Sequence, residues 1–154
     1  MASSQNGWPA SPDPKTIEAN SYVVPGTELK LRVARKVAPI LINFAGEFNE
    51  LVEKLEGKQH DDWAYAWRNV RGSTDMLSNH ASATAIDLNA TRHPLGRKGT
   101  FKPKQVDTIL ELCDKYNIRW GGTFKRRPDE MHFEIVEGPL AVKATIERLG
   151  LEKL

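Results

Sequence analysis

The chain has 154 residues and a mass of 17.3 kDa, enough for one compact domain whose core needs no disulfide staples. Hydrophobic residues make up 40% and charged residues 27%, a balance that excludes a largely disordered chain. The formal net charge is only +2, so bulk charge does not direct the protein to nucleic acid or to another anionic polymer.

The cysteine count and the apolar runs exclude a disulfide-stabilised domain and a membrane-spanning protein. The one cysteine, Cys113, cannot form an internal disulfide, and its apolar surroundings predict a buried helix position rather than a catalytic thiol. No run of 18 apolar residues exists, so we expect no membrane span. The first residues lack the basic and apolar regions of a signal peptide, so we expect synthesis in a cytoplasm without a secretion leader.

The N-terminal part of the chain differs in composition from the rest. Residues 1–28 hold four of the nine prolines, which predicts an extended arm, with Trp8 as its anchor. A single domain is expected over residues 29–154. Apolar residues recur at three- and four-residue steps from Leu31 to Leu55, which predicts a long amphipathic helix interrupted near Pro39.

The remaining elements alternate between short strands and helices. Strands are predicted at residues 63–67, 85–88, 118–120 and 131–136, and helices at 103–116 and 139–149. Pro139 suits the first turn of the last helix and Gly150 suits its end. Residues 90–104 form a basic loop that we expect to border a groove. The predicted fold is therefore α+β, with helices packed on a small antiparallel sheet.

Two histidines and an aspartate form the most informative group of the sequence. His80 and Asp87 are seven residues apart, too far to meet on one helix, so a strand or loop reversal must bring them together. His132 would arrive from a separate strand. Three protein ligands leave the fourth position of a tetrahedral zinc site open, which is typical of hydrolytic rather than structural sites.

The residues around this group resemble the motif of a known enzyme family. Ser78, His80, Ala85 and Asp87 fit the pattern Ser-x-His-x-x-Gly-x-Ala-x-Asp of the zinc D-Ala-D-Ala carboxypeptidases and L-Ala-D-Glu endopeptidases, with Ala83 at the glycine position. This family includes the vancomycin-resistance dipeptidases and many phage endolysins. Trp120-Gly121-Gly122-Thr123-Phe124, Asp129 and Met131-His132-Phe133-Glu134 resemble its closing block, in the same order. If Ala83 needs positive φ, its Cβ costs about 1 kcal/mol without removing a ligand.

The resemblance implies one Zn²⁺ ion, held by His80, Asp87 and His132. The family position of the general base is Asp129, three residues before the second histidine. In an extended chain, side chains alternate between faces, so Glu130 and not Asp129 would share the face of His132. A turn after Pro128 would break this alternation and allow Asp129 to face the ligands. Asp129 is therefore the first candidate and Glu130 the second.

The resemblance also implies an arginine that stabilises the oxyanion, a substrate-binding serine and a residue behind the ligands. Arg68 is the first candidate for the arginine and Arg71 the second. Ser78 either binds substrate or caps a turn. Glu134 either orients a ligand or an arginine through a hydrogen bond or pairs in the sheet.

The other two histidines match no family ligand. We therefore expect His60 and His93 to be surface residues, with His93 in the loop after the aspartate ligand. His93 is also a candidate groove residue, because that loop follows Asp87.

The function implied by the resemblance is zinc-dependent hydrolysis of the peptide stem of bacterial peptidoglycan. The small size and the absent signal peptide favour a monomeric phage endolysin with L-Ala-D-Glu endopeptidase activity that acts at the cell wall. D-Ala-D-Ala carboxypeptidase activity is one alternative, and a non-catalytic wall-peptide-binding protein of the same fold is another.

A nucleic-acid-binding module is a further alternative. Basic residues near Phe101 and Phe124 would suit it, but they can instead line a groove for an anionic wall polymer. We therefore do not expect nucleic acid as a partner.

Overall fold

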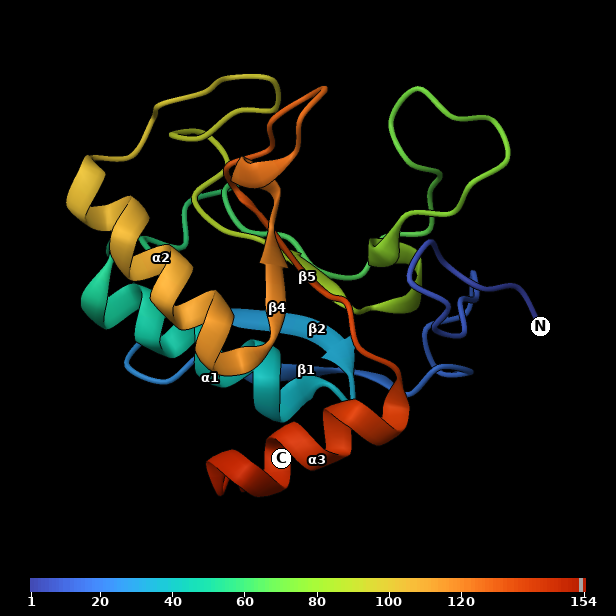
Figure 1. The fold of residues 1–154 in the computed structure, drawn as a ribbon. Coiled ribbons are helices and arrows are strands. Elements are labelled where there is room, and N and C mark those ends of the chain that lie inside the picture. The colour runs from blue at the N-terminus through green and yellow to red at the C-terminus, as the bar shows by residue number, and fades with distance from the viewer. Residues whose placement is uncertain (153) are drawn as a thin grey trace.

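The computed structural model describes residues 1–152 and 154, and these form an α+β fold with two antiparallel sheets and three α-helices (Figure 1). The fold class predicted from the sequence is confirmed. Among the described residues, no helix combines the length and the apolar composition needed to cross a membrane.

The first sheet is a hairpin of β1 (Ala19–Val23) and β2 (Lys30–Ala34), followed by α1 (Ala38–Leu51). The prediction of a helix from Leu31 was wrong. Leu31 and Val33 are buried while Lys30 and Arg32 are exposed, a period of two that suits a strand paired with β1. Pro39 lies in the first turn of α1, where its missing N–H does no harm, and does not interrupt the helix.

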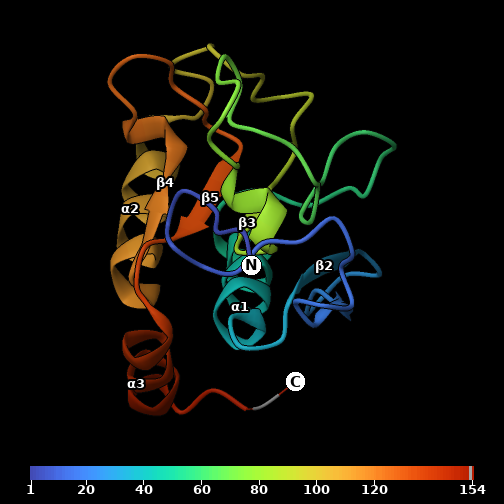
Figure 2. The ribbon, with the colours of Figure 1, turned by 90° about the vertical axis from the view of Figure 1, so that its right-hand side faces the viewer.

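The N-terminal residues pack on the body of the protein. Trp8 is buried, as an anchor should be, and its Nε1 donates a hydrogen bond to the Glu137 carbonyl at 2.8 Å. Figure 2 shows this segment crossing in front of the short 3₁₀-helix η1 (Asn79–Ser82). The division of the chain at residue 28 stays a prediction.

The second sheet has the order β3 (Ala85–Asp87), β5 (His132–Ile135), β4 (Ile118–Trp120). The predicted helices at 103–116 and 139–149 are confirmed as α2 (Pro103–Tyr116) and α3 (Pro139–Leu149).

The predicted strand at residues 63–67 is not a regular strand. Trp63 exchanges two hydrogen bonds with Asp87, but Tyr65 bonds to Arg32 and Ala66 bonds to His80. Because its partners change from residue to residue, this segment joins three different neighbours instead of extending one ladder.

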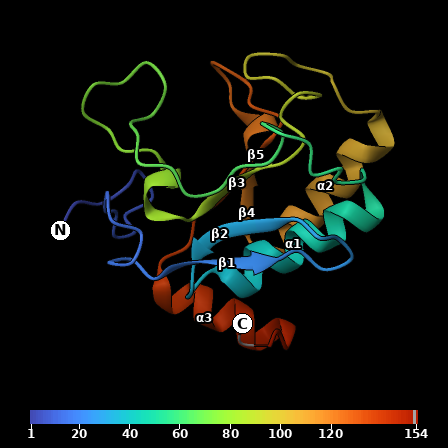
Figure 3. The same cartoon turned by 180° about the vertical axis from the view of Figure 1, so that it is seen from behind.

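The second sheet has an apolar face and a polar face. Phe133 of β5 packs on Phe44 and Phe48 of α1, with ring centroids 4.7 and 5.7 Å apart. Figure 3 shows the β1–β2 hairpin beside α1, on which both sheets pack. Since side chains alternate along a strand, His132 and Glu134 point to the opposite face from Phe133. That face carries the candidate site, which includes His132 and Glu134.

Candidate metal centre

The strand register brings two of the three predicted ligands together. Asp87 at the end of β3 lies directly opposite His132 at the start of β5. Opposite residues of an antiparallel pair have Cβ atoms about 4.5–5.5 Å apart. The His132 Nδ1 is accordingly 3.1 Å from the Asp87 Oδ1.

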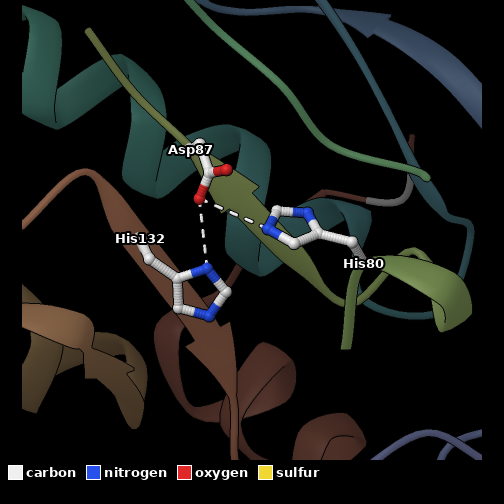
Figure 4. Close-up of side chains that lie close together, drawn as sticks. All are labelled: His80, Asp87 and His132. Atoms are coloured by element: carbon white, nitrogen blue, oxygen red, sulfur yellow. Dashed lines mark hydrogen bonds and ion pairs between the residues drawn. The ribbon is translucent and has the colours of Figure 1, made fainter. Parts of the chain in front are cut away.

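The third ligand comes from η1, just before β3. The Ser78 hydroxyl accepts a hydrogen bond from the His80 backbone N–H at 3.1 Å and so caps this turn. Ala83 ends the turn with φ of 57°, the left-handed conformation that explains the glycine of the family motif. The chain thereby reverses into β3, and the His80 Nε2 lies 3.3 Å from the Asp87 Oδ1 (Figure 4).

The three side chains fit a metal ion. Their candidate ligand atoms all lie within 4.8 Å of one another, and all three residues are buried. The His80 Nδ1 lies 2.6 Å from the Ala64 carbonyl, so Nδ1 carries the proton and Nε2 is left as the acceptor. That Nε2 is buried without a hydrogen-bond partner. A cation bound between Nε2 and Asp87 would satisfy this atom.

His132 is held by carboxylates on both sides. Its Nε2 lies 2.7 Å from the Glu134 Oε1, as expected for a ligand oriented from behind. Burial alone would lower the pKa of His132, but hydrogen bonds to Asp87 and Glu134 raise it to about 10. Burial alone would raise the pKa of Asp87, but His80 and His132 hold it well below its usual range. A metal ion that replaced the Nδ1 proton would keep the bond to Glu134.

Asp129 lies beside the three ligands. The Asp129 carbonyl accepts from the His132 N–H at 3.1 Å, so a turn follows Pro128 and the chain is not extended here. The Asp129 N–H bonds to the Gly121 carbonyl, and a Cβ on Gly121 would come within 2.3 Å of the Asp129 carbonyl oxygen. The close approach explains this glycine of the closing block. The Asp129 Oδ1 is buried without a partner, and burial together with Asp87 raises the pKa of Asp129.

Glu130 points elsewhere. Its carboxylate accepts hydrogen bonds from the Gly99 N–H at 3.1 Å and the Thr100 N–H at 2.7 Å, and also from the Thr100 hydroxyl. These contacts join the loop before α2 to the segment that precedes β5. Glu130 does not line the cavities beside the ligands, so the geometry favours Asp129 as the base.

Both candidate arginines border the site. Arg68 is half-buried and its Nη1 donates to the Asn69 carbonyl at 3.2 Å, whereas Arg71 is exposed. Burial, and then Arg71, lower the pKa of Arg68, while the charges of Asp87 and Asp129 oppose that shift. Arg68 therefore interacts electrostatically with two carboxylates of the site, Asp87 and Asp129.

Two cavities flank the ligands and together form a groove. One of about 620 Å³ borders His132 and the other of about 490 Å³ borders Asp87. Residues that line both are Arg68, Arg71, His80, Leu95, Arg127 and Asp129. The sequence did not identify the lining residues Gln5 and Arg119, whereas Leu95 lies in the loop expected to border a groove, and the basic residues near Phe124 were expected to line a groove in one interpretation. The basic run at 125–127 was the signal for that interpretation.

The N-terminal segment also supports the site. The Gln5 N–H bonds to the Leu77 carbonyl, which places Gln5 at the edge of the groove. The Asn6 Nδ2 donates to the Thr84 hydroxyl at 2.8 Å and to the Ile135 carbonyl at 2.9 Å, and so joins the chain before β3 to the end of β5. These contacts link the strands that carry Asp87 and His132.

The expectation for His93 was wrong and that for His60 is confirmed. His60 is exposed, but His93 is 1% exposed and stacks on Phe101 with ring centroids 3.6 Å apart. The His93 Nε2 lies 2.8 Å from the Glu53 Oε1, across 40 residues of sequence. Cys113 is buried as expected, and burial raises the pKa of its thiol to about 12.

The comparison with protein families supports the same conclusion as the geometry. Residues 71–135 match the model of a family described as D-alanyl-D-alanine carboxypeptidase. This segment contains His80, Asp87, Asp129 and His132, and the match supports the family that the motifs indicated. No curated protein and no solved structure matches the chain.

Proposed function

We propose that the protein is a zinc-dependent peptidase that hydrolyses the peptide stem of bacterial peptidoglycan. The observation that carries this proposal is the convergence of His80, Asp87 and His132, with an unpartnered His80 Nε2 and an acid beside the ligands. The family match over residues 71–135 supports the reaction class.

Zinc held by these three residues would supply Lewis-acid chemistry, making water more acidic and polarising the scissile carbonyl. Asp129 would accept a proton from the attacking water and deliver it to the leaving amine. Its free Oδ1 and raised pKa suit both halves of that transfer.

The remaining site residues position substrate and ligand. Arg68 would donate to the oxyanion that develops at the scissile carbonyl, a role that Arg71 fits less well because it is exposed. Glu134 fixes the orientation of His132 through the 2.7 Å contact to Nε2. The Ser78 hydroxyl caps η1 and borders the groove, where it can also contact substrate.

Endopeptidase activity is the finer proposal, with cleavage between L-Ala and D-Glu. Cavities lie on both sides of the ligands, so a peptide chain can continue in both directions from the scissile bond. We further propose a monomeric phage endolysin that is made in a host cytoplasm and acts at the cell wall.

D-Ala-D-Ala carboxypeptidase activity is the second candidate. The description of the matched family favours it, and cations beside the ligands could bind a terminal carboxylate. A non-catalytic wall-peptide-binding protein would keep the same groove without cleavage.

Digestion of purified peptidoglycan and of synthetic stem peptides, with mass spectrometry of the products, tests these candidates. Fragments split after L-Ala, lost on chelation and restored by zinc, are expected for the endopeptidase. Release of only a terminal D-Ala would assign the carboxypeptidase. Absence of cleavage by the zinc-loaded protein would refute the enzymatic proposal.

A further inference from the structure

The two arms of the groove differ in chemical character. The cavity on the His132 side, here the basic arm, is lined by Arg119, Lys125 and Arg126 in addition to the residues that the two cavities share. The cavity on the Asp87 side, here the apolar arm, is lined instead by Trp63, Ala64, Ala66, Ala90 and Met131. Arg68, Arg71 and Arg127 line both cavities, so a substrate lying across the ligands meets additional cations only on the His132 side and additional small or apolar side chains only on the Asp87 side.

Among the described residues, Lys125 and Arg126 of the basic arm have no acidic partner. Elsewhere Arg35, Arg92 and Lys115 pair with glutamates at 2.6–3.0 Å. In the described part of the chain, no carboxylate lies within ion-pair distance of Lys125 or Arg126, and Arg119 has only Glu134 at 3.9 Å. Unpaired cations around a concave surface concentrate a positive potential that attracts anions.

The apolar arm is matched to a small side chain. Three of its lining residues are alanines, and Trp63, which also lines it, is 46% exposed. Alanine side chains leave room for a methyl group, whereas no cation unique to this arm is available to bind a carboxylate.

We propose that the basic arm binds a carboxylate carried by the substrate residue on one side of the scissile bond, while the apolar arm takes a small residue such as alanine on the other side. The inference rests on the proposed peptidase function and specifies its subsites. Guanidinium groups suit this ligand because they can donate two parallel hydrogen bonds to a carboxylate.

Three synthetic peptides separate the possible sources of the carboxylate. The parent is L-Ala-γ-D-Glu-L-Lys with both carboxylates free; the second has the α-carboxyl of D-Glu as an amide, and the third has the C-terminal carboxyl as an amide. We expect the zinc-loaded wild type to cleave the parent and the third peptide with kcat/KM about tenfold above the second. A loss confined to the third peptide would place the bound carboxylate at the chain terminus and overturn the internal assignment.

The variant Lys125→Gln/Arg126→Gln tests the arm itself. Its ratio of kcat/KM between the parent and the second peptide should fall about tenfold toward one. The matched control Lys104→Gln/Lys143→Gln removes the same charge from exposed positions on α2 and α3 and should keep the wild-type ratio. An unchanged ratio in the first variant would refute the proposal.

Binding distinguishes failure of the arm from failure of the proposed function. If no peptide is cleaved, the peptidase function fails. Calorimetric titration of the zinc-loaded wild type with the parent and the second peptide then tests the arm alone. Tighter binding of the parent, lost in the arm variant, supports the arm, and equal binding overturns it.

Discussion

Two buried clusters in this protein pair histidine with carboxylate, and they differ in whether every ring nitrogen has a partner. In the open cluster of His80, Asp87 and His132, the His80 Nε2 has no hydrogen-bond partner. In the closed cluster, the His93 Nε2 meets Glu53 at 2.8 Å and its Nδ1 meets Thr100 at 2.6 Å. His80 and His93 are equally buried, each 1% exposed.

Burial of a histidine therefore does not identify its function. A buried polar atom left without a partner is costly unless something absent from the chain satisfies it. The open cluster could hold a metal ion, whereas the closed cluster joins the segment after α1 to the loop before α2. Substitutions in the two clusters should therefore differ in whether they affect metal binding or stability.

The largest effect is expected from removing one histidine of each cluster. His80→Ala should abolish metal binding and reduce peptidase activity to background, because one of three ligands is lost. His93→Ala should lower the free energy of unfolding by about 2–4 kcal/mol while the folded protein keeps its metal affinity. Chelator competition and urea unfolding measure the two quantities. Loss of metal binding in folded His93→Ala would break the comparison.

Asp129→Asn should lower kcat by about 10²–10⁴ because it removes the proton acceptor beside the ligands. Metal affinity should change little, since Asp129 is not one of the three ligands. Glu130→Gln is the matched control and should keep kcat, because its carboxylate lies against Gly99 and Thr100. Equal losses in both variants would contradict the assignment of the base.

The clusters offer a matched pair of glutamates, each bonded to a histidine Nε2. Glu134→Gln should weaken metal affinity or activity by about 10–100-fold, since Glu134 orients His132. Glu53→Gln should instead cost about 1–2 kcal/mol of stability. Zinc titration and urea unfolding of both variants measure these effects. A loss of metal affinity in Glu53→Gln would contradict the assignment of different roles to the two clusters.

The smallest effect is a pH dependence carried by the closed cluster. Burial alone would raise the pKa of Glu53, but hydrogen bonds from His93 and Asn89 outweigh it and lower the pKa below 4.5. Because the folded pKa is lowered, the stabilisation is present above the unfolded value and is lost as pH falls through the folded one. The stability difference between wild type and Glu53→Gln should therefore shrink between about pH 6 and about pH 3. If the stability difference stayed constant over this pH range, the ionised Glu53 carboxylate would not be its source.

Local patterns accounted for α2, α3 and the strands β3, β4 and β5, since the apolar periodicity of these elements and the prolines that begin both helices lie within each segment. They did not account for residues 63–67, whose partners change from residue to residue. The same patterns failed at residues 31–34, where a strand period and a helix period overlap and only pairing with β1 decides. They also failed at His93, whose partner Glu53 lies 40 residues away.

The sequence by itself predicted His80, Asp87 and His132 as ligands and Asp129 as the base, because the motif that they match places these residue types at short, local spacings. Tertiary structure alone decided which side chains meet. The register of β3 with β5 sets Asp87 against His132, and the Gly121 contact turns Asp129 toward the ligands while Glu130 turns away. Side-chain direction in each case depends on backbone hydrogen bonds to segments distant in sequence, which no local pattern records.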